Sequence, residues 1–223
     1  MNLLSAIEIE PATPATHSVI WMHGLGADGN DFVPIVRELS LPKQIAIRFI
    51  FPHAPTRPVT INGGYVMRAW YDIAEPDTFR REDETGLRES QRAIETLIAR
   101  EVERGILSKN IVLAGFSQGG AMALQTGLRY PHKLAGIMVL SGYLPLAPTL
   151  PGEAHTANAA TPIFMAHGRN DAVIPLPIAT ASKQRLTAAG YEVEWHEYRM
   201  EHTVCEEEIA DISNFFRRQM SLA

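Results

Sequence analysis

The sequence predicts a single α/β domain, spanning residues 1–223, built on a mostly parallel, doubly wound sheet with helices on both faces. Two observations support this prediction. Short, nearly continuous apolar runs, typical of strands covered on both faces, alternate along the chain with segments whose apolar residues recur at helical spacing. The length of 223 residues, without an internal repeat or a domain linker, suits one domain with one sizeable core.

The elements can be placed in order along the chain. An alternating pattern predicts an edge strand at 6–10, and apolar runs predict strands at 18–22, 45–51, 111–114, 134–140 and 162–167, with a last alternating strand at 191–198. Helical spacing predicts helices at 32–39, 83–105, 121–126, 178–189 and 206–220. Residues 56–81 resemble a long connection, whose apolar side chains either line an acyl-binding groove or pack as satellite core under a loop.

Composition excludes several classes of partner. The formal net charge is −5 and no run of lysine or arginine occurs, which argues against nucleic acid or an anionic membrane surface as a partner. No apolar run approaches the roughly 20 residues of a spanning helix, so no stable membrane insertion is expected. The N-terminal segment lacks the basic residues of a secretory signal, and the only cysteine, Cys205, excludes an internal disulfide. We therefore expect a cytoplasmic protein.

A strand, a sharp turn and a helix meet at Ser117. The apolar run at 111–114 leads into Gly115-Phe116-Ser117-Gln118-Gly119, and helical residues follow directly. This is the G-x-S-x-G pattern of the nucleophile elbow of an α/β-hydrolase, in which the turn lifts the serine hydroxyl clear of the sheet. Glycines at both ends of the pattern allow the strand and the helix to approach closely around a strained serine. Ser117 is the predicted nucleophile.

A serine nucleophile needs a histidine base and a carboxylate that orients it, and on this fold they follow the serine in the order acid, then histidine. His202 lies between the last strand and the final helix, whereas His196 lies inside that strand. Asp171 follows the strand at 162–167, whereas Asp211 comes after the histidine and breaks the order. Glu192, Glu194 and Glu197 also precede the histidine but lie within the last strand. Asp171 and His202 are therefore the predicted acid and base.

The segment after the strand at 18–22 contains a misleading motif. Gly24, Gly26 and Gly29 match the dinucleotide pattern G-x-G-x-x-G, but the next strand ends without the carboxylate that would hold a ribose. A His-Gly turn that exposes backbone N–H groups to a developing oxyanion is the better interpretation. The predicted oxyanion donors are the backbone N–H groups of Leu25 and Gln118.

Other residues with reactive side chains are expected to be structural. His23 and His167 each precede a glycine at a strand end, where a histidine can shape the turn. Cys205 does not lie in a nucleophile-elbow motif, and it is expected at the start of the final helix. The sequence has no H-E-x-x-H or C-x-x-C pattern, so no metal and no cofactor are expected.

Several motifs together resemble those of the phospholipase/carboxylesterase family of α/β-hydrolases, which includes bacterial carboxylesterases and acyl-protein thioesterases. They are Trp21-Met22-His23-Gly24-Leu25-Gly26-Ala27-Asp28-Gly29-Asn30-Asp31, Pro52-His53-Ala54-Pro55, Trp70-Tyr71-Asp72, Gly115-Phe116-Ser117-Gln118-Gly119-Gly120, His167-Gly168 with Asp171, and Glu201-His202. The resemblance covers nearly the whole length and implies Ser117, Asp171 and His202 as the triad. It also implies Leu25 and Gln118 as oxyanion donors, no cofactor, no large lid domain and a possible homodimer.

These observations predict a serine carboxylesterase that cleaves short to medium acyl esters through an acyl-serine intermediate. The substrate is then a small-molecule acyl ester or an acylated thiol. Expected substrate contacts are Trp70, Tyr71, Tyr143 and Leu144.

The alternatives are an acyl-protein thioesterase or a lysophospholipase with the same site, or a peptidase or a dienelactone-type hydrolase on the same scaffold. Serine at the elbow disfavours the dienelactone type, which typically has cysteine there. A non-catalytic binding protein with this fold is more remote, because such proteins usually lose a triad member.

Overall fold

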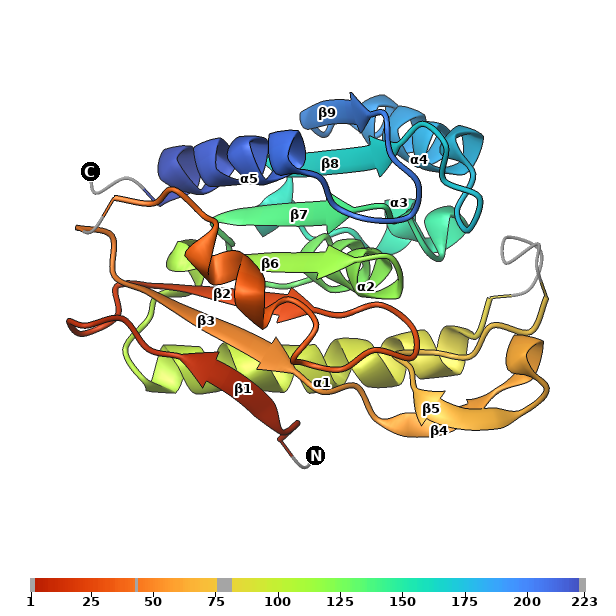
Figure 1. The fold of residues 1–223 in the computed structure, drawn as a ribbon, viewed down its shortest axis with the longest axis horizontal. Coiled ribbons are helices and arrows are strands. Elements are labelled where there is room, and N and C mark those ends of the chain that lie inside the picture. The colour runs from red at the N-terminus through yellow and green to blue at the C-terminus, as the bar shows by residue number, and fades with distance from the viewer. Residues whose placement is uncertain (1–2, 43, 76–81, 221–223) are drawn as a thin grey trace.

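A computed structural model describes residues 3–42, 44–75 and 82–220. Its centre is a seven-stranded sheet in the order β1-β3-β2-β6-β7-β8-β9 (Figure 1). The strands are β1 (Ala6–Ile9), β2 (His17–Met22), β3 (Ile47–Pro52), β6 (Ile111–Phe116), β7 (Gly136–Leu140), β8 (Ile163–Gly168) and β9 (Val193–Tyr198). Within this sheet, as far as the structure describes it, the β1–β3 pair is antiparallel and the other neighbouring pairs are parallel, as expected for an added edge strand. The predicted α/β fold with a mostly parallel sheet is therefore confirmed.

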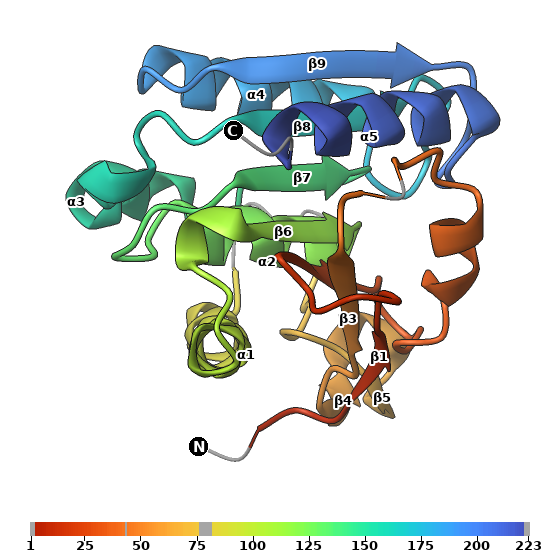
Figure 2. The same cartoon turned by 90° about the vertical axis from the view of Figure 1, so that its left-hand side faces the viewer.

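Helices cover both faces of the sheet. They are α1 (Glu84–Glu103), α2 (Gln118–Gly127), α3 (Leu150–Glu153), α4 (Leu176–Ala188) and α5 (Glu206–Gln219). Along β2, Ile20 and Met22 pack on the face of α1 and α2, while Val19 and Trp21 pack on the face of α5. Figure 2 shows α1 and α5 on opposite sides of the sheet. Both faces of the strands are thus buried, which explains the continuous apolar runs in the sequence.

Two predicted elements differ from the structure. The helix expected at 32–39 is a short 3₁₀ helix, η1 (Val33–Arg37), with a proline in its first turn. The connection expected at 56–81 contains a two-stranded hairpin, β4 (Thr56–Val59) and β5 (Tyr65–Arg68), turned by Gly63 and Gly64 at positive φ. Each strand has only four residues and the pair lies outside the main sheet, so neither produces a long apolar run. Residues 76–81 of that connection lie outside the described residues.

Parallel strands bring their carboxyl ends to one edge of the sheet, and this arrangement positions the site. β6 ends at Phe116, β7 at Leu140 and β8 at Gly168, so the segments that follow them meet at the same edge (Figure 1). Ligands of open α/β sheets bind in the crevice outside these carboxyl ends. Across the described ranges, no helix combines the length and the apolar character needed to cross a membrane.

Candidate active site

Ser117 occupies a strained turn between β6 and α2. Its φ of 54° and ψ of −119° are unfavourable for a residue with a Cβ, and such strain is typical of functional positions. The turn is held by the backbone N–H of Ser117, which donates to the Leu140 carbonyl at 2.8 Å. A Cβ on Gly115 would lie 2.2 Å from the Gly119 carbonyl carbon, and a Cβ on Gly119 would lie 2.2 Å from the Met22 oxygen. Only glycine allows this close approach, as the elbow motif predicts.

Asp171 lies in the loop after β8 and is almost completely buried. One carboxylate oxygen, Oδ1, accepts hydrogen bonds from the backbone N–H groups of Val173 and Ile174 at 2.9 and 2.8 Å. The other oxygen, Oδ2, lies 2.7 Å from Nδ1 of His202. Since a carboxylate only accepts, Nδ1 of His202 carries the proton and donates. The carboxylate is therefore held by the loop with one oxygen and orients the imidazole with the other.

His202 lies in the loop between β9 and α5. Its ring packs against that of Phe116, the residue before Ser117, with centroids 4.7 Å apart. With Nδ1 donating to Asp171, Nε2 has a free lone pair and can accept a proton. The structure thus brings the three predicted triad residues to one edge of the sheet, from the segments after β6, β8 and β9.

His167 lies beside this pair but has a different function. Its Nε2 donates to the Ile174 carbonyl at 2.7 Å, and burial lowers the pKa of its imidazole. The same nitrogen is 3.4 Å from Oδ2 of Asp171. His167 therefore fixes the loop that carries the acid, which agrees with the structural function expected from the sequence.

His23 organises the segment that carries Leu25. Its Nδ1 donates to the Gly24 carbonyl at 2.7 Å, and its Nε2 accepts from the Ala54 N–H at 3.0 Å. The indole N–H of Trp70 donates to the His23 carbonyl at 2.9 Å. Burial lowers the pKa of His23 to about 4, so the ring is neutral at neutral pH. A neutral ring with one donor and one acceptor is what this turn requires.

The side chain of Gln118 joins the elbow to the segment after β5. Its amide oxygen accepts from the Trp70 N–H at 2.7 Å, and its amide nitrogen donates to the Tyr71 carbonyl at 2.8 Å. Sequence reasoning assigned importance only to the backbone N–H of Gln118. The sequence offered no signal for the side-chain contacts, because they join residues 47 and 48 positions apart.

A cavity of about 700 Å³ opens beside the predicted nucleophile. Its lining combines Ser117 with both predicted oxyanion residues, the hairpin segment and the loop after the acid: Leu25, Ile61, Asn62, Tyr71, Ile73, Gln118, Tyr143, Ala172, Val173, Ile174, Pro175 and Ile178. Tyr71 and Tyr143 were expected here. The apolar residues at 172–175 were not expected, although an apolar run directly after a candidate acid is a sequence signal that could have indicated them.

Two residues expected to contact substrate lie elsewhere. Trp70 is fully buried, and its indole N–H is used to hold His23. Leu144 faces a separate groove, and its backbone N–H donates to Ser182. Neither lines the cavity beside Ser117, so the structure does not support direct substrate contact for Trp70 and Leu144. Their neighbours Tyr71 and Tyr143 supply the cavity surface instead.

Within the described part of the chain, no group of three or more histidine, cysteine, aspartate or glutamate side chains is arranged to hold a metal ion. Cys205 is a half-buried free thiol that precedes α5, which is the position expected from the sequence. Burial raises the pKa of this thiol, which disfavours the thiolate.

The fold and this arrangement define the chain as an α/β-hydrolase. The sequence model of the phospholipase/carboxylesterase family matches residues 5–220, and the chain belongs to this family. The chain is therefore a serine hydrolase of the α/β-hydrolase superfamily, as the motifs predicted.

Similar proteins include fungal acyl-protein thioesterases and a plant protein of known structure. Acyl-protein thioesterase 1 of Neurospora crassa is 40% identical, over 92% of this chain and 87% of that protein. The protein of the same name from Gibberella zeae is 37% identical, over 94% of this chain and 93% of its own length. The crystal structure of Arabidopsis thaliana SOBER1 has a TM-score of 0.87 at 31% identity, covering 92% of this chain and 99% of that chain.

Proposed function

We propose that this chain hydrolyses carboxylic esters, including thioesters, through an acyl intermediate on Ser117. The observation that supports this proposal best is the 2.7 Å contact between His202 Nδ1 and Asp171 Oδ2, at the sheet edge that carries the strained serine. A serine of this kind needs a base whose free nitrogen is fixed in orientation.

In the proposed reaction, Nε2 of His202 takes the Ser117 proton while the oxygen of Ser117 attacks the carbonyl carbon. The negative charge on the carbonyl oxygen is stabilised by the backbone N–H groups of Leu25 and Gln118. His202 then returns the proton to the leaving alcohol or thiol. Water enters, loses a proton to His202 and releases the acid from Ser117 by the same steps in reverse order.

The residues that line the cavity indicate which part of the substrate occupies it. The acyl carbon must lie between Ser117 and the oxyanion donors, whereas the leaving group must lie near His202, which protonates it. The described residues that line the cavity include Ser117, Leu25 and Gln118 but neither His202 nor Asp171. We therefore assign the cavity to the acyl group, with the leaving group on the His202 side.

Short to medium acyl esters are the primary proposed substrates, because the cavity beside Ser117 is apolar and bounded. The second candidate substrates are thioesters of acylated proteins. They are supported by the name of the similar fungal proteins, acyl-protein thioesterase 1. Both candidates use the same acyl cavity and differ in the leaving group.

The test uses wild type and Ser117→Ala with a fluorophosphonate probe, followed by intact mass. One adduct on wild type, none on the variant, and loss of p-nitrophenyl butyrate hydrolysis in the variant are expected. Parallel assays with matched S-acyl and O-acyl peptides then compare the two candidate substrates. A folded wild-type protein that neither reacts with the probe nor hydrolyses any acyl substrate would contradict the proposal.

The possible homodimer and the cytoplasmic location remain predictions from the sequence. Sedimentation velocity of the purified chain tests the first, and cell fractionation tests the second.

A further inference from the structure

A second apolar hollow lies next to the acyl cavity, along the same helix. It is a groove of about 480 Å³ whose lining residues come from the segment after β7 and from the end of α4: Leu144, Ala147, Pro148, Leu150, Pro151, Arg185, Ala188 and Ala189. On α4, Ile178 lines the cavity and Arg185 lines the groove. Seven helical residues span about 10 Å, so the two hollows are consecutive along α4.

The chain between them forms a partition. Tyr143 faces the cavity, and the next residue, Leu144, faces the groove. The hydroxyl of Tyr143 lies 2.7 Å from that of Tyr71, so one donates to the other. The backbone N–H of Leu144 donates to Oγ of Ser182 at 3.0 Å, and Ser182 lies between the two hollows on α4. The partition is therefore attached both to the segment after β5 and to α4.

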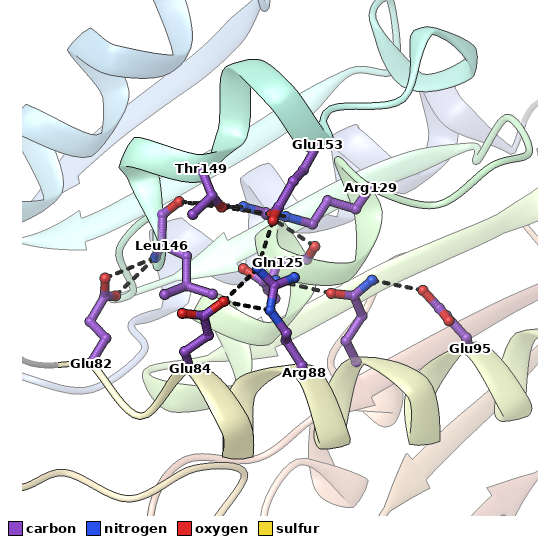
Figure 3. A network of polar contacts seen from close by, with 10 residues as sticks. Glu82, Glu84, Arg88, Glu95, Gln125, Arg129, Leu146, Thr149 and Glu153 are labelled. Atoms are coloured by element: carbon purple, nitrogen blue, oxygen red, sulfur yellow. Dashed lines mark hydrogen bonds and ion pairs between the residues drawn. The ribbon is translucent and has the colours of Figure 1, made fainter.

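The segment that follows the partition is held equally firmly. The Leu146 N–H donates to the Glu82 carboxylate at 3.0 Å. Figure 3 shows this contact beside a network in which the Glu153 carboxylate, on α3, accepts from Arg129 at 2.7 Å and from Arg88 at 2.6 Å. The Arg129 side chain is only 4% exposed and the Glu153 side chain is 29% exposed, so this ion pair is partly shielded from water. These contacts oppose a movement of the partition away from the cavity.

We propose that the hydrogen-bonded pair Tyr71–Tyr143 closes the end of the acyl cavity and sets the upper limit on acyl chain length. This inference rests on the proposed function, because only an acyl group on Ser117 would extend into this cavity.

The two phenol rings suit such a barrier. They are 3% and 4% exposed, and the hydroxyl of one donates to the hydroxyl of the other inside a largely apolar surrounding. A growing acyl chain gains apolar contact until it meets the rings, and each newly buried methylene can raise kcat/KM by up to about fourfold. Beyond that length, the chain can advance only by displacing Tyr143 and breaking the hydroxyl contact. Chains that are too long therefore lose rate.

The test compares kcat/KM for p-nitrophenyl esters from acetyl to palmitoyl, in one detergent, for wild type and Tyr143→Ala. Wild type is expected to reach a maximum at a short or medium chain and then decline. Tyr143→Ala removes the ring that closes the cavity and leaves room for a longer acyl chain. Its maximum is expected at a longer chain, with a dodecanoyl-to-butanoyl rate ratio at least about tenfold above that of wild type.

Two control variants distinguish the loss of the barrier from a general loosening of the protein around the cavity. Leu150→Ala enlarges the groove on the far side of the partition, and its dodecanoyl-to-butanoyl ratio is expected to equal that of wild type. Tyr143→Phe keeps the ring and is expected to keep the length limit. If circular dichroism shows that Tyr143→Ala does not fold, Tyr143→Leu replaces it. A smaller shift of the kcat/KM maximum toward longer chains is then expected.

The outcomes distinguish the two proposals. If wild type hydrolyses short esters but the folded Tyr143 variants keep the wild-type chain-length profile, the barrier assignment is overturned and the proposed function stands. An equal shift in Leu150→Ala would overturn the assignment too. If wild type hydrolyses no acyl ester of any length, the proposed function itself fails, and the barrier assignment with it.

Discussion

Acidification should destabilise this protein through His23, the buried histidine below the predicted oxyanion segment. Burial lowers its pKa to about 4, from 6.5 for an unfolded histidine. Between these two values the unfolded chain binds a proton that the native protein does not. The stability contributed by neutral His23 is therefore complete above about pH 6.5 and is lost as the pH falls toward 4.

The magnitude follows from the difference between the two pKa values. Each pKa unit corresponds to about 1.4 kcal/mol, so the free energy of unfolding should fall by about 3 kcal/mol between pH 7.5 and pH 4 through this residue. His23→Gln provides the comparison, because glutamine can still accept from the Ala54 N–H but does not titrate. The lost bond to the Gly24 carbonyl should cost the variant about 1–2 kcal/mol at pH 7.5.

The assay is urea unfolding, followed by tryptophan fluorescence, of wild type and His23→Gln at several pH values from 7.5 to 4. Contributions of the other titrating groups are common to both proteins and cancel in the difference. Wild type should be the more stable protein at pH 7.5, and the difference should shrink and then reverse toward pH 4. A difference that stays constant across this range would refute the claim that His23 is held neutral by burial.

Three further outcomes are expected. Asp171→Asn keeps an oxygen that accepts from the backbone N–H groups of the loop, so the melting temperature should change little. Because the variant loses the carboxylate that orients His202, kcat for butyrate esters should fall roughly 10⁴-fold. Gln118→Ala leaves the Trp70 N–H and the Tyr71 carbonyl buried without partners, so urea unfolding should show a loss of roughly 2–5 kcal/mol, with some activity retained because the backbone N–H remains. Burial raises the pKa of Glu208 to about 8, although a hydrogen bond with the Cys205 backbone acts to lower it. Between pH 4.5 and pH 8 this carboxyl is ionised in the unfolded chain but not in the native protein, so it destabilises the fold increasingly as the pH rises through this range. Glu208→Gln should therefore be more stable than wild type at pH 8.5 by roughly 2–4 kcal/mol in the same assay, and equal stability at that pH would contradict the raised pKa.

The elbow could be predicted from the sequence because its determinants are local. A buried strand, two glycines four positions apart and a following helix force a strained turn at Ser117 wherever the rest of the chain lies. Chain order then selected Asp171 and His202 from the other candidates, because parallel strands bring the segments after them to one edge. The hairpin of β4 and β5 was missed because strands of four residues leave no distinctive period.

The sequence by itself therefore determined the fold class, the elbow and the order of the predicted triad. Only the tertiary structure decided that Gln118 holds the segment after β5, that Tyr71 meets Tyr143 across 72 positions, and that Trp70 is buried away from the cavity. The reason is physical. Periodicity and turn chemistry depend on residues within a few positions of each other, whereas the walls of a cavity depend on which side chains distant segments bring into contact when they pack.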